Sequence, residues 1–123
     1  MFAEAYELQA GLFKALMHPA RLAILDILRH GEECVCHMEA VLGYRQAYIS
    51  QQLMMLRKAG LVEDRRDGWN IYYRVTRPDI YHVIDAMNEV VGQKPVLAAR
   101  STHLREERCL CPKCNLAAEA VGN

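Results

Sequence analysis

The 123-residue chain lacks the features that would direct it to a membrane or out of the cell. No apolar run approaches the roughly 20 residues that a membrane-spanning helix requires. Residues 1–4 have neither the basic nor the apolar region of a signal peptide. We therefore expect a cytoplasmic protein with no membrane partner.

The sequence also lacks the motifs of common catalytic sites. It contains no Gly-rich phosphate loop, no Ser-His-Asp order and no pair of carboxylates in a supporting context. A thiol oxidoreductase needs its Cys-x-x-Cys in a β-α-β setting, whereas Cys111 and Cys114 lie in a polar tail. We therefore expect a protein that is not an enzyme.

An excess of one charge is missing as well, because Lys and Arg balance Asp and Glu at 15 each. The charges are nevertheless unevenly distributed, since residues 43–77 carry seven basic and three acidic side chains. A local basic patch on a neutral protein suits reversible DNA binding, because phosphate attraction depends on the contacting face. Ordinary solvated surface charge explains the same pattern.

Five cysteines are present, an odd number for a chain with no export signal. A secreted disulfide framework is therefore disfavoured, and metal or redox chemistry is favoured. The cysteines form two tight groups, one of Cys34 and Cys36 and one of Cys109, Cys111 and Cys114. Casual packing in a core does not explain such clustering.

Hydrophobic periodicity predicts a mainly helical chain with one small β-hairpin. Asp67-Gly68 between two β-rich runs is typical of a hairpin turn. The predicted order is two helices, a short third helix, a fourth helix, a β-hairpin and a last helix. This is the order of a winged helix-turn-helix. We expect this domain over residues 1–94 and a cysteine-containing tail over residues 95–123. The predicted helices cover residues 3–17, 19–30, 38–42, 44–59 and 79–91, and the predicted strands cover residues 61–65 and 71–75.

The fourth helix carries the polar side chains that a recognition helix needs. In such a fold the second helix of the pair enters the major groove, and residues near its N-terminus reach the base edges. Gln pairs well with adenine, and the Ala methyl can meet a thymine methyl. Trp69 is expected to pack beneath the hairpin rather than touch DNA. The residues that we expect to contact DNA are Arg45, Gln46, Ala47, Tyr48, Ser50, Gln51, Arg57, Lys58 and the wing residues Arg65 and Arg66.

Three stretches resemble the ArsR/SmtB family of metal-responsive repressors. ALMHPARLAIL at residues 15–25 resembles the opening signature, and ISQQLMMLRKAGLV at residues 49–62 resembles the recognition helix and its exit. Asp67-Gly68 followed by YYRV at residues 72–75 resembles the wing. The resemblance implies a homodimer, paired through its first and last helices, on a palindromic operator.

The resemblance also implies a role for the first cysteine group. Cys34-Val35-Cys36 is similar to the family's soft-ion sensing motif, in which both cysteines are ligands, although His37 replaces the acid that usually follows. Relatives often carry a third cysteine where this chain has Glu39. Asp79 is followed by Tyr81 rather than by the pattern of the family's other site, a zinc site on the last helix.

Soft sulfur ligands select arsenite, antimonite, cadmium, lead or zinc over magnesium or calcium. We expect a thiolate site of Cys34 and Cys36 that is completed by at least one of Cys109, Cys111 and Cys114. The completing cysteine can come from the same subunit or from the other subunit of the dimer. Three alternatives remain open. The thiols can sense oxidants or sulfide by forming a disulfide or polysulfide bridge. The tail can hold a separate structural metal. The chain can also be a metal-scavenging or partner-binding module.

Overall fold

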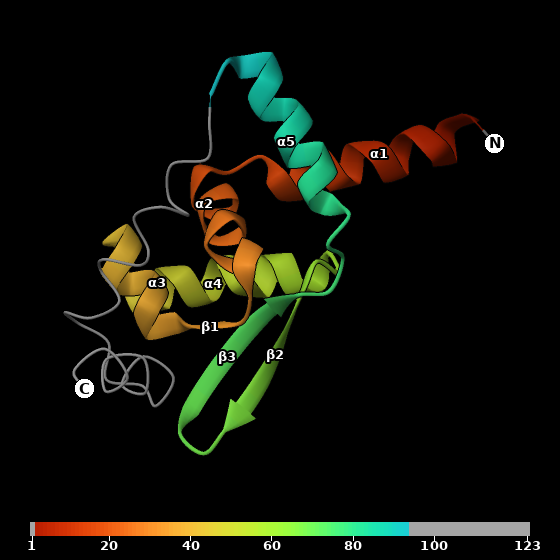
Figure 1. Ribbon diagram of the computed structural model, residues 1–123. Helices are drawn as coiled ribbons and strands as arrows, with labels where there is room; N and C mark the ends of the chain where they lie inside the picture. Colours follow the sequence, from red (N-terminus) through yellow and green to blue (C-terminus); the bar gives the residue numbers. More distant parts are fainter. Residues whose placement is uncertain (1, 94–123) are drawn as a thin grey trace.

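The computed structural model describes residues 2–93, which form five α-helices, a 3-10 turn and a three-stranded antiparallel sheet (Figure 1). The predicted tail, with Cys109, Cys111 and Cys114, lies outside these residues. The helical order and the hairpin confirm the predicted winged helix-turn-helix. The elements are α1 (Phe2–Leu16), α2 (Pro19–Ile27), η1 (Leu28–His30), β1 (Glu33–Cys34), α3 (Val35–Leu42), α4 (Gln46–Lys58), β2 (Val62–Asp67), β3 (Asn70–Val75) and α5 (Ile80–Val91).

The helix α3 begins three residues earlier than predicted because Cys34 caps it. The Cys34 backbone is extended, and its Sγ accepts a hydrogen bond from the His37 N–H over 3.4 Å. At the other end, Gly43 adopts the left-handed conformation, with φ at 75°, and stops the helix. The next helix, α4, starts after Arg45, whose extended backbone shortens it by two residues relative to the prediction.

The sheet contains one strand that the sequence did not predict. β1 is two residues long and joins the outer side of the hairpin, so the strand order is β1-β3-β2. Its register places Cys34 opposite Tyr72 of β3. On the other side β2 pairs with β3 from Val62–Val75 to Asp67–Asn70, so the hairpin turn is only Gly68 and Trp69.

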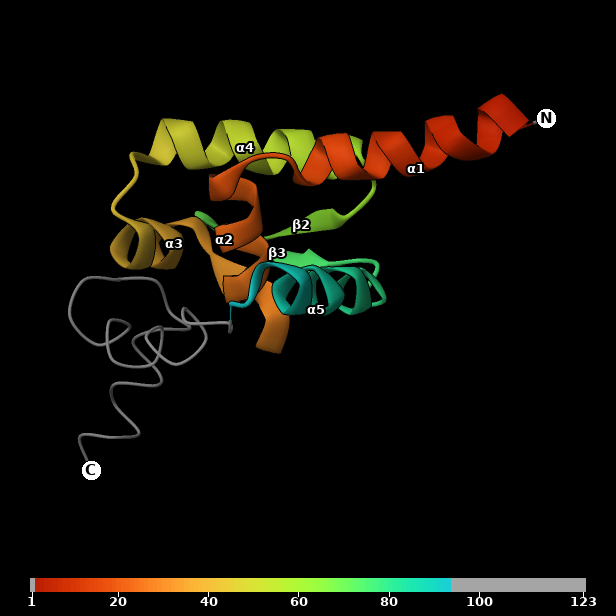
Figure 2. The ribbon, with the colours of Figure 1, turned by 90° about the horizontal axis from the view of Figure 1, so that it is seen from above.

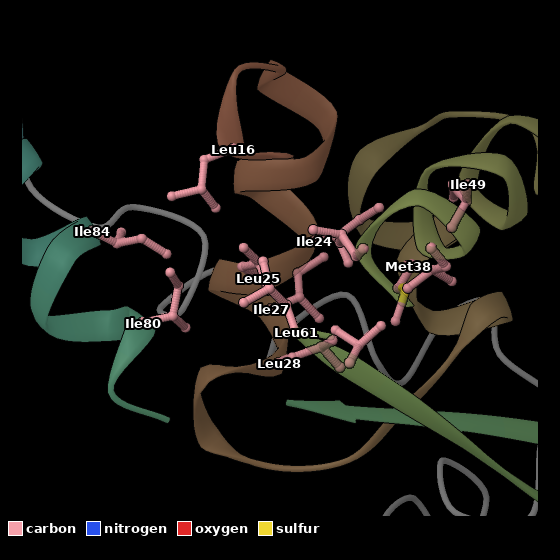
Figure 3. Packing of buried hydrophobic residues seen from close by; sticks show 13 residues of the cluster. Leu16, Ile24, Leu25, Ile27, Leu28, Met38, Ile49, Leu61, Ile80 and Ile84 are labelled. Carbon is pink, nitrogen blue, oxygen red and sulfur yellow. The ribbon is translucent and has the colours of Figure 1, made fainter. Parts of the chain in front are cut away.

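One hydrophobic core joins the helices to the base of the hairpin (Figure 3). Ile24 and Leu25 of α2 are fully buried, as are Ile49 and Leu53 of α4. Ile49 and Leu53, together with the buried Leu56, form the inward face of α4. Each such side chain contributes about 1.5–3 kcal/mol by leaving water, and together they fix α4 against α2 and α3.

The apolar residues of α1, by contrast, remain mostly exposed. Leu16 is buried, but Tyr6, Leu8 and Phe13 are 64%, 77% and 61% exposed. Figure 2 shows α1 extending past the rest of the domain towards the N-terminus. Val90 and Val91 at the end of α5 are exposed as well. Apolar area of this extent on a small domain indicates an interaction surface.

Trp69 corrects one prediction. The side chain was expected to pack beneath the hairpin, yet it is 101% exposed. A two-residue turn leaves no sheet surface below its tip, so the indole points into solvent. None of the described helices has the length and apolar character to cross a membrane.

The exposed tip makes a direct prediction, since Trp69 is the chain's one tryptophan. The fluorescence of the protein without DNA should peak at the long wavelength of water-exposed indole. Acrylamide should quench it about as strongly as it quenches N-acetyltryptophanamide. A blue-shifted emission protected from acrylamide would contradict this placement of the wing tip.

Candidate nucleic-acid interface and thiol site

The N-terminal half of α4 presents most of the predicted reading residues to solvent. Arg45, Gln46, Ala47 and Gln51 are exposed, and Ser50 is half-buried. Gln52 points the other way: it is buried, and its Oε1 accepts a hydrogen bond from Arg21 Nε over 2.8 Å. The exposed side chains are accessible to DNA, whereas the buried Gln52 amide holds α4 against α2.

Tyr48 is partly buried and contacts His18 and Tyr44. The Nδ1 of His18, the N-cap of α2, accepts from the Ala20 N–H over 3.3 Å. The Nε2 atom of the same ring lies 3.2 Å from the Tyr48 hydroxyl, at hydrogen-bond distance. The Tyr44 ring packs against Tyr48 with centroids 5.1 Å apart. These contacts orient the start of α4.

The predicted backbone-contacting residues lie at the end of α4 and on β2. Arg57, Lys58, Arg65 and Arg66 are all exposed. Two of them already have acidic partners: Arg57 Nη1 lies 3.1 Å from Asp64 Oδ1. Arg65 Nη2 lies 2.6 Å from Oε1 of Glu32, a residue 33 positions earlier in the chain.

Cys34 and Cys36 bring their sulfurs within 2.8 Å of each other at the start of α3. Cys34 is buried, with 2% of its surface exposed, and Cys36 is partly exposed. Backbone N–H groups at a helix start stabilise negative charge, so the position favours the thiolate form that binds soft ions. The pair thus offers two converging sulfur ligands with access from solvent through Cys36.

Acidic and imidazole side chains are buried beside the sulfurs. Glu33 is 5% exposed and His37 is fully buried, with His37 Nε2 at 3.9 Å from Glu33 Oε2. Within residues 2–93, no three side chains of His, Cys, Asp or Glu are grouped closely enough to hold a metal ion. The described residues therefore supply two sulfur ligands, and the predicted third ligand falls on the tail.

Two aromatic side chains lie where the sequence did not predict them. Trp69 lies in the two-residue turn at the wing tip and is fully exposed. Tyr72 is buried against both cysteines in a small cluster of its own. Exposure of an aromatic side chain and pairing of a two-residue strand leave no periodic signal in a sequence.

Comparison with known proteins supports this reading of the fold. Residues 18–64 match the family described as "Bacterial regulatory protein, arsR family". The HTH-type transcriptional regulator Rv0081 of Mycobacterium tuberculosis is 36% identical over 104 residues, covering 84% of this chain and 90% of the relative. The arsenic resistance regulator ArsR1 of Pseudomonas putida is 44% identical over 77 residues, or 62% and 59% of the two chains.

A solved structure gives the same result. The homodimeric winged helix-turn-helix domain Mb0332 of Mycobacterium bovis is 33% identical, with a TM-score of 0.64 over 73% of this chain and 83% of that one. The residues that match the family, 18–64, cover the helix-turn-helix and the start of the wing. The chain belongs to the ArsR family of bacterial regulatory proteins, which are DNA-binding transcriptional regulators of the winged helix-turn-helix fold.

Proposed function

We propose that this regulator is a repressor whose homodimer binds a palindromic operator and releases it when its thiols capture a soft ion. The candidate inducers are arsenite, antimonite, cadmium, lead and zinc. The observation that carries the proposal is the pair of sulfurs, Cys34 and Cys36, at the capped start of α3. The relative named as an arsenic resistance regulator supports the same class of inducer.

The chemistry of the pair favours soft ions. Thiolates bind arsenic, cadmium, lead and zinc strongly and bind hard cations poorly. Two sulfurs alone leave an ion of this kind short of ligands, so one or more of Cys109, Cys111 and Cys114 completes the site in our proposal. Because the buried Cys34 is one ligand, capture has to rearrange packed groups rather than a loose surface loop.

DNA binding is assigned to the exposed face of α4 together with the wing. Gln46 and Gln51 suit base edges, whereas Arg57, Lys58 and Arg66 suit phosphates. We add Trp69 to this surface, because an indole at a basic wing tip can pack on sugars or bases in the minor groove. The other members are Arg45, Ala47, Tyr48, Ser50 and Arg65.

The second copy in the homodimer is assigned to the exposed apolar surface of α1 and α5. Phe13 lies beside Val83, Met87 and Val90 in a nearly apolar groove between these helices. The α1 and α5 helices of a second copy of the protein would cover that surface symmetrically, as a two-fold dimer requires. The homodimer reported for Mb0332 supports this assignment.

Release requires only a modest energetic coupling. An ion shifts the equilibrium between two dimer geometries by no more than its difference in affinity for them. A coupling of about 1–3 kcal/mol weakens operator binding roughly 5- to 150-fold. Only a geometry in which both α4 helices fit successive major grooves binds tightly.

Thiol oxidation is the second candidate function, and the short sulfur separation favours it. Two thiols at 2.8 Å need little movement to join. A peroxide would take two electrons and two protons from the thiols, so that an S–S bond forms and the peroxide leaves as water or alcohol. An organic trisulfide would instead transfer its inner sulfur between the two cysteines, forming an S–S–S bridge, and would leave as two thiols that carry the two protons. Oxidants and ions therefore need separate arms in any test.

The variant Cys34→Ser tests the sensing role. Serine is a good helix N-cap, so α3 and the operator affinity of the ion-less protein should be retained. Cadmium or arsenite should no longer weaken operator binding in a gel-shift titration, whereas it should weaken wild-type binding roughly 5- to 150-fold. Val35→Ala, between the two cysteines, is the control and should respond like the wild type. Normal release by Cys34→Ser would remove this residue from the site.

The variant Arg66→Ala tests the wing as a phosphate contact. Log K for DNA falls as log salt rises, and each lost phosphate contact makes this slope less steep by about 1. The slope of Arg66→Ala should therefore be about 1 less steep than that of the wild type. Arg77→Ala is the matched control, since Arg77 is also exposed but pairs with Asp79 before α5. Equal slopes for Arg66→Ala and the wild type would exclude the contact.

A further inference from the structure

Cys34, Tyr72 and Arg65 form one row across the three strands of the sheet. Cys34 of β1 lies opposite Tyr72 of β3, and Tyr72 lies opposite Arg65 of β2. Tyr72 is 2% exposed and packs against Cys34. The row therefore leads from a sulfur ligand directly to a basic residue of the wing.

A second contact closes the row from the outside. Glu32, which immediately precedes β1, accepts hydrogen bonds from Arg65 Nε over 3.1 Å and from Arg65 Nη2 over 2.6 Å. The Arg65 guanidinium also lies over the Tyr72 ring, 4.8 Å from its centroid. Two parallel charge-assisted hydrogen bonds fix a guanidinium in position and orientation. Glu32 and Tyr72 together thus hold Arg65 in one place on the wing.

Capture of an ion has to disturb this arrangement. Two thiolates at about 2.3 Å from a tetrahedral zinc ion lie ~3.8 Å apart, and the larger cadmium ion holds them at least as far apart. The present sulfur separation is 2.8 Å, so the two side chains must move apart when they become ligands. Cys34 is buried against Tyr72, and packed interiors transmit such displacements to their neighbours.

We propose that Glu32 and Tyr72 are positioning residues that couple the thiol site to the wing through Arg65. The inference rests on the proposed function and names its route of regulation. With the sulfurs in their present positions, Glu32 and Tyr72 hold Arg65 where the wing meets DNA. When the sulfurs take an ion, Tyr72 and the Glu32 segment shift, the Glu32–Arg65 pair opens, and the wing loses its DNA-binding position.

The hairpin offers a matched control pair. Glu63 of β2 and Arg74 of β3 form an exposed ion pair between residues that lie opposite each other in the hairpin. Neither residue belongs to the row that contains Cys34. Breaking this pair removes a similar wing contact without interrupting the proposed route.

The test measures operator affinity with and without cadmium for the full-length wild type, Glu32→Gln, Arg65→Lys and Glu63→Gln. The operator affinity of the wild type and of Glu63→Gln should fall roughly 5- to 150-fold when cadmium binds. Glu32→Gln should bind cadmium normally, which the ultraviolet absorption of cadmium thiolates measures. Its operator affinity without cadmium should, however, become nearly equal to its operator affinity with cadmium. Arg65→Lys keeps the charge, and hence the salt slope, but loses the two-pronged contact, so its affinities should converge too.

Each result decides the question. A wild-type affinity ratio in Glu32→Gln overturns the coupling route, as does an equal loss of both affinities, which indicates a merely structural role. Loss of cadmium binding in Glu32→Gln also overturns it, because Glu32 would then act in capture. If wild-type binding is indifferent to cadmium, arsenite and oxidants, the proposed function itself fails, and the coupling fails with it.

Discussion

The pairing of Cys34 with Tyr72 is the contact on which the rest of the structure depends. It turns two residues between η1 and α3 into a strand, which adds a third member to the wing hairpin. Cys34 also caps α3, because its Sγ accepts a hydrogen bond from the His37 N–H. One side chain therefore belongs to the sheet that carries the wing, to the helix that precedes the recognition helix, and to the pair of thiols.

The recognition helix is held by polar contacts from a different direction. His18 reaches Tyr48, and Arg21 reaches both Gln52 and the carbonyl of Ala15 at the end of α1. The surface assigned to the dimer partner begins at this end of α1. A change in how two copies pack is thus linked by hydrogen bonds to the orientation of α4, while a change at the thiols is linked through the sheet to the wing.

Local signals made much of this fold predictable. Periodic apolar residues identified the helices, and Asp67-Gly68 identified the hairpin, because each depends on residues near in sequence. β1 was missed because two residues have no period. The Glu32–Arg65 contact joins residues 33 positions apart, and no local pattern encodes it. The exposure of Trp69 follows from the tightness of the turn, which was expected to be longer. The cysteine pair was found from its spacing, but its place beside Tyr72 required the structure.

Native mass spectrometry of the protein bound to its operator duplex, titrated with cadmium or arsenite, tests the central claim most directly. The account predicts a complex of two chains on one duplex without the ion. As ion is added, free duplex should appear together with a protein dimer heavier by the mass of the bound ion. A complex that takes up the ion and stays on the duplex would contradict the account.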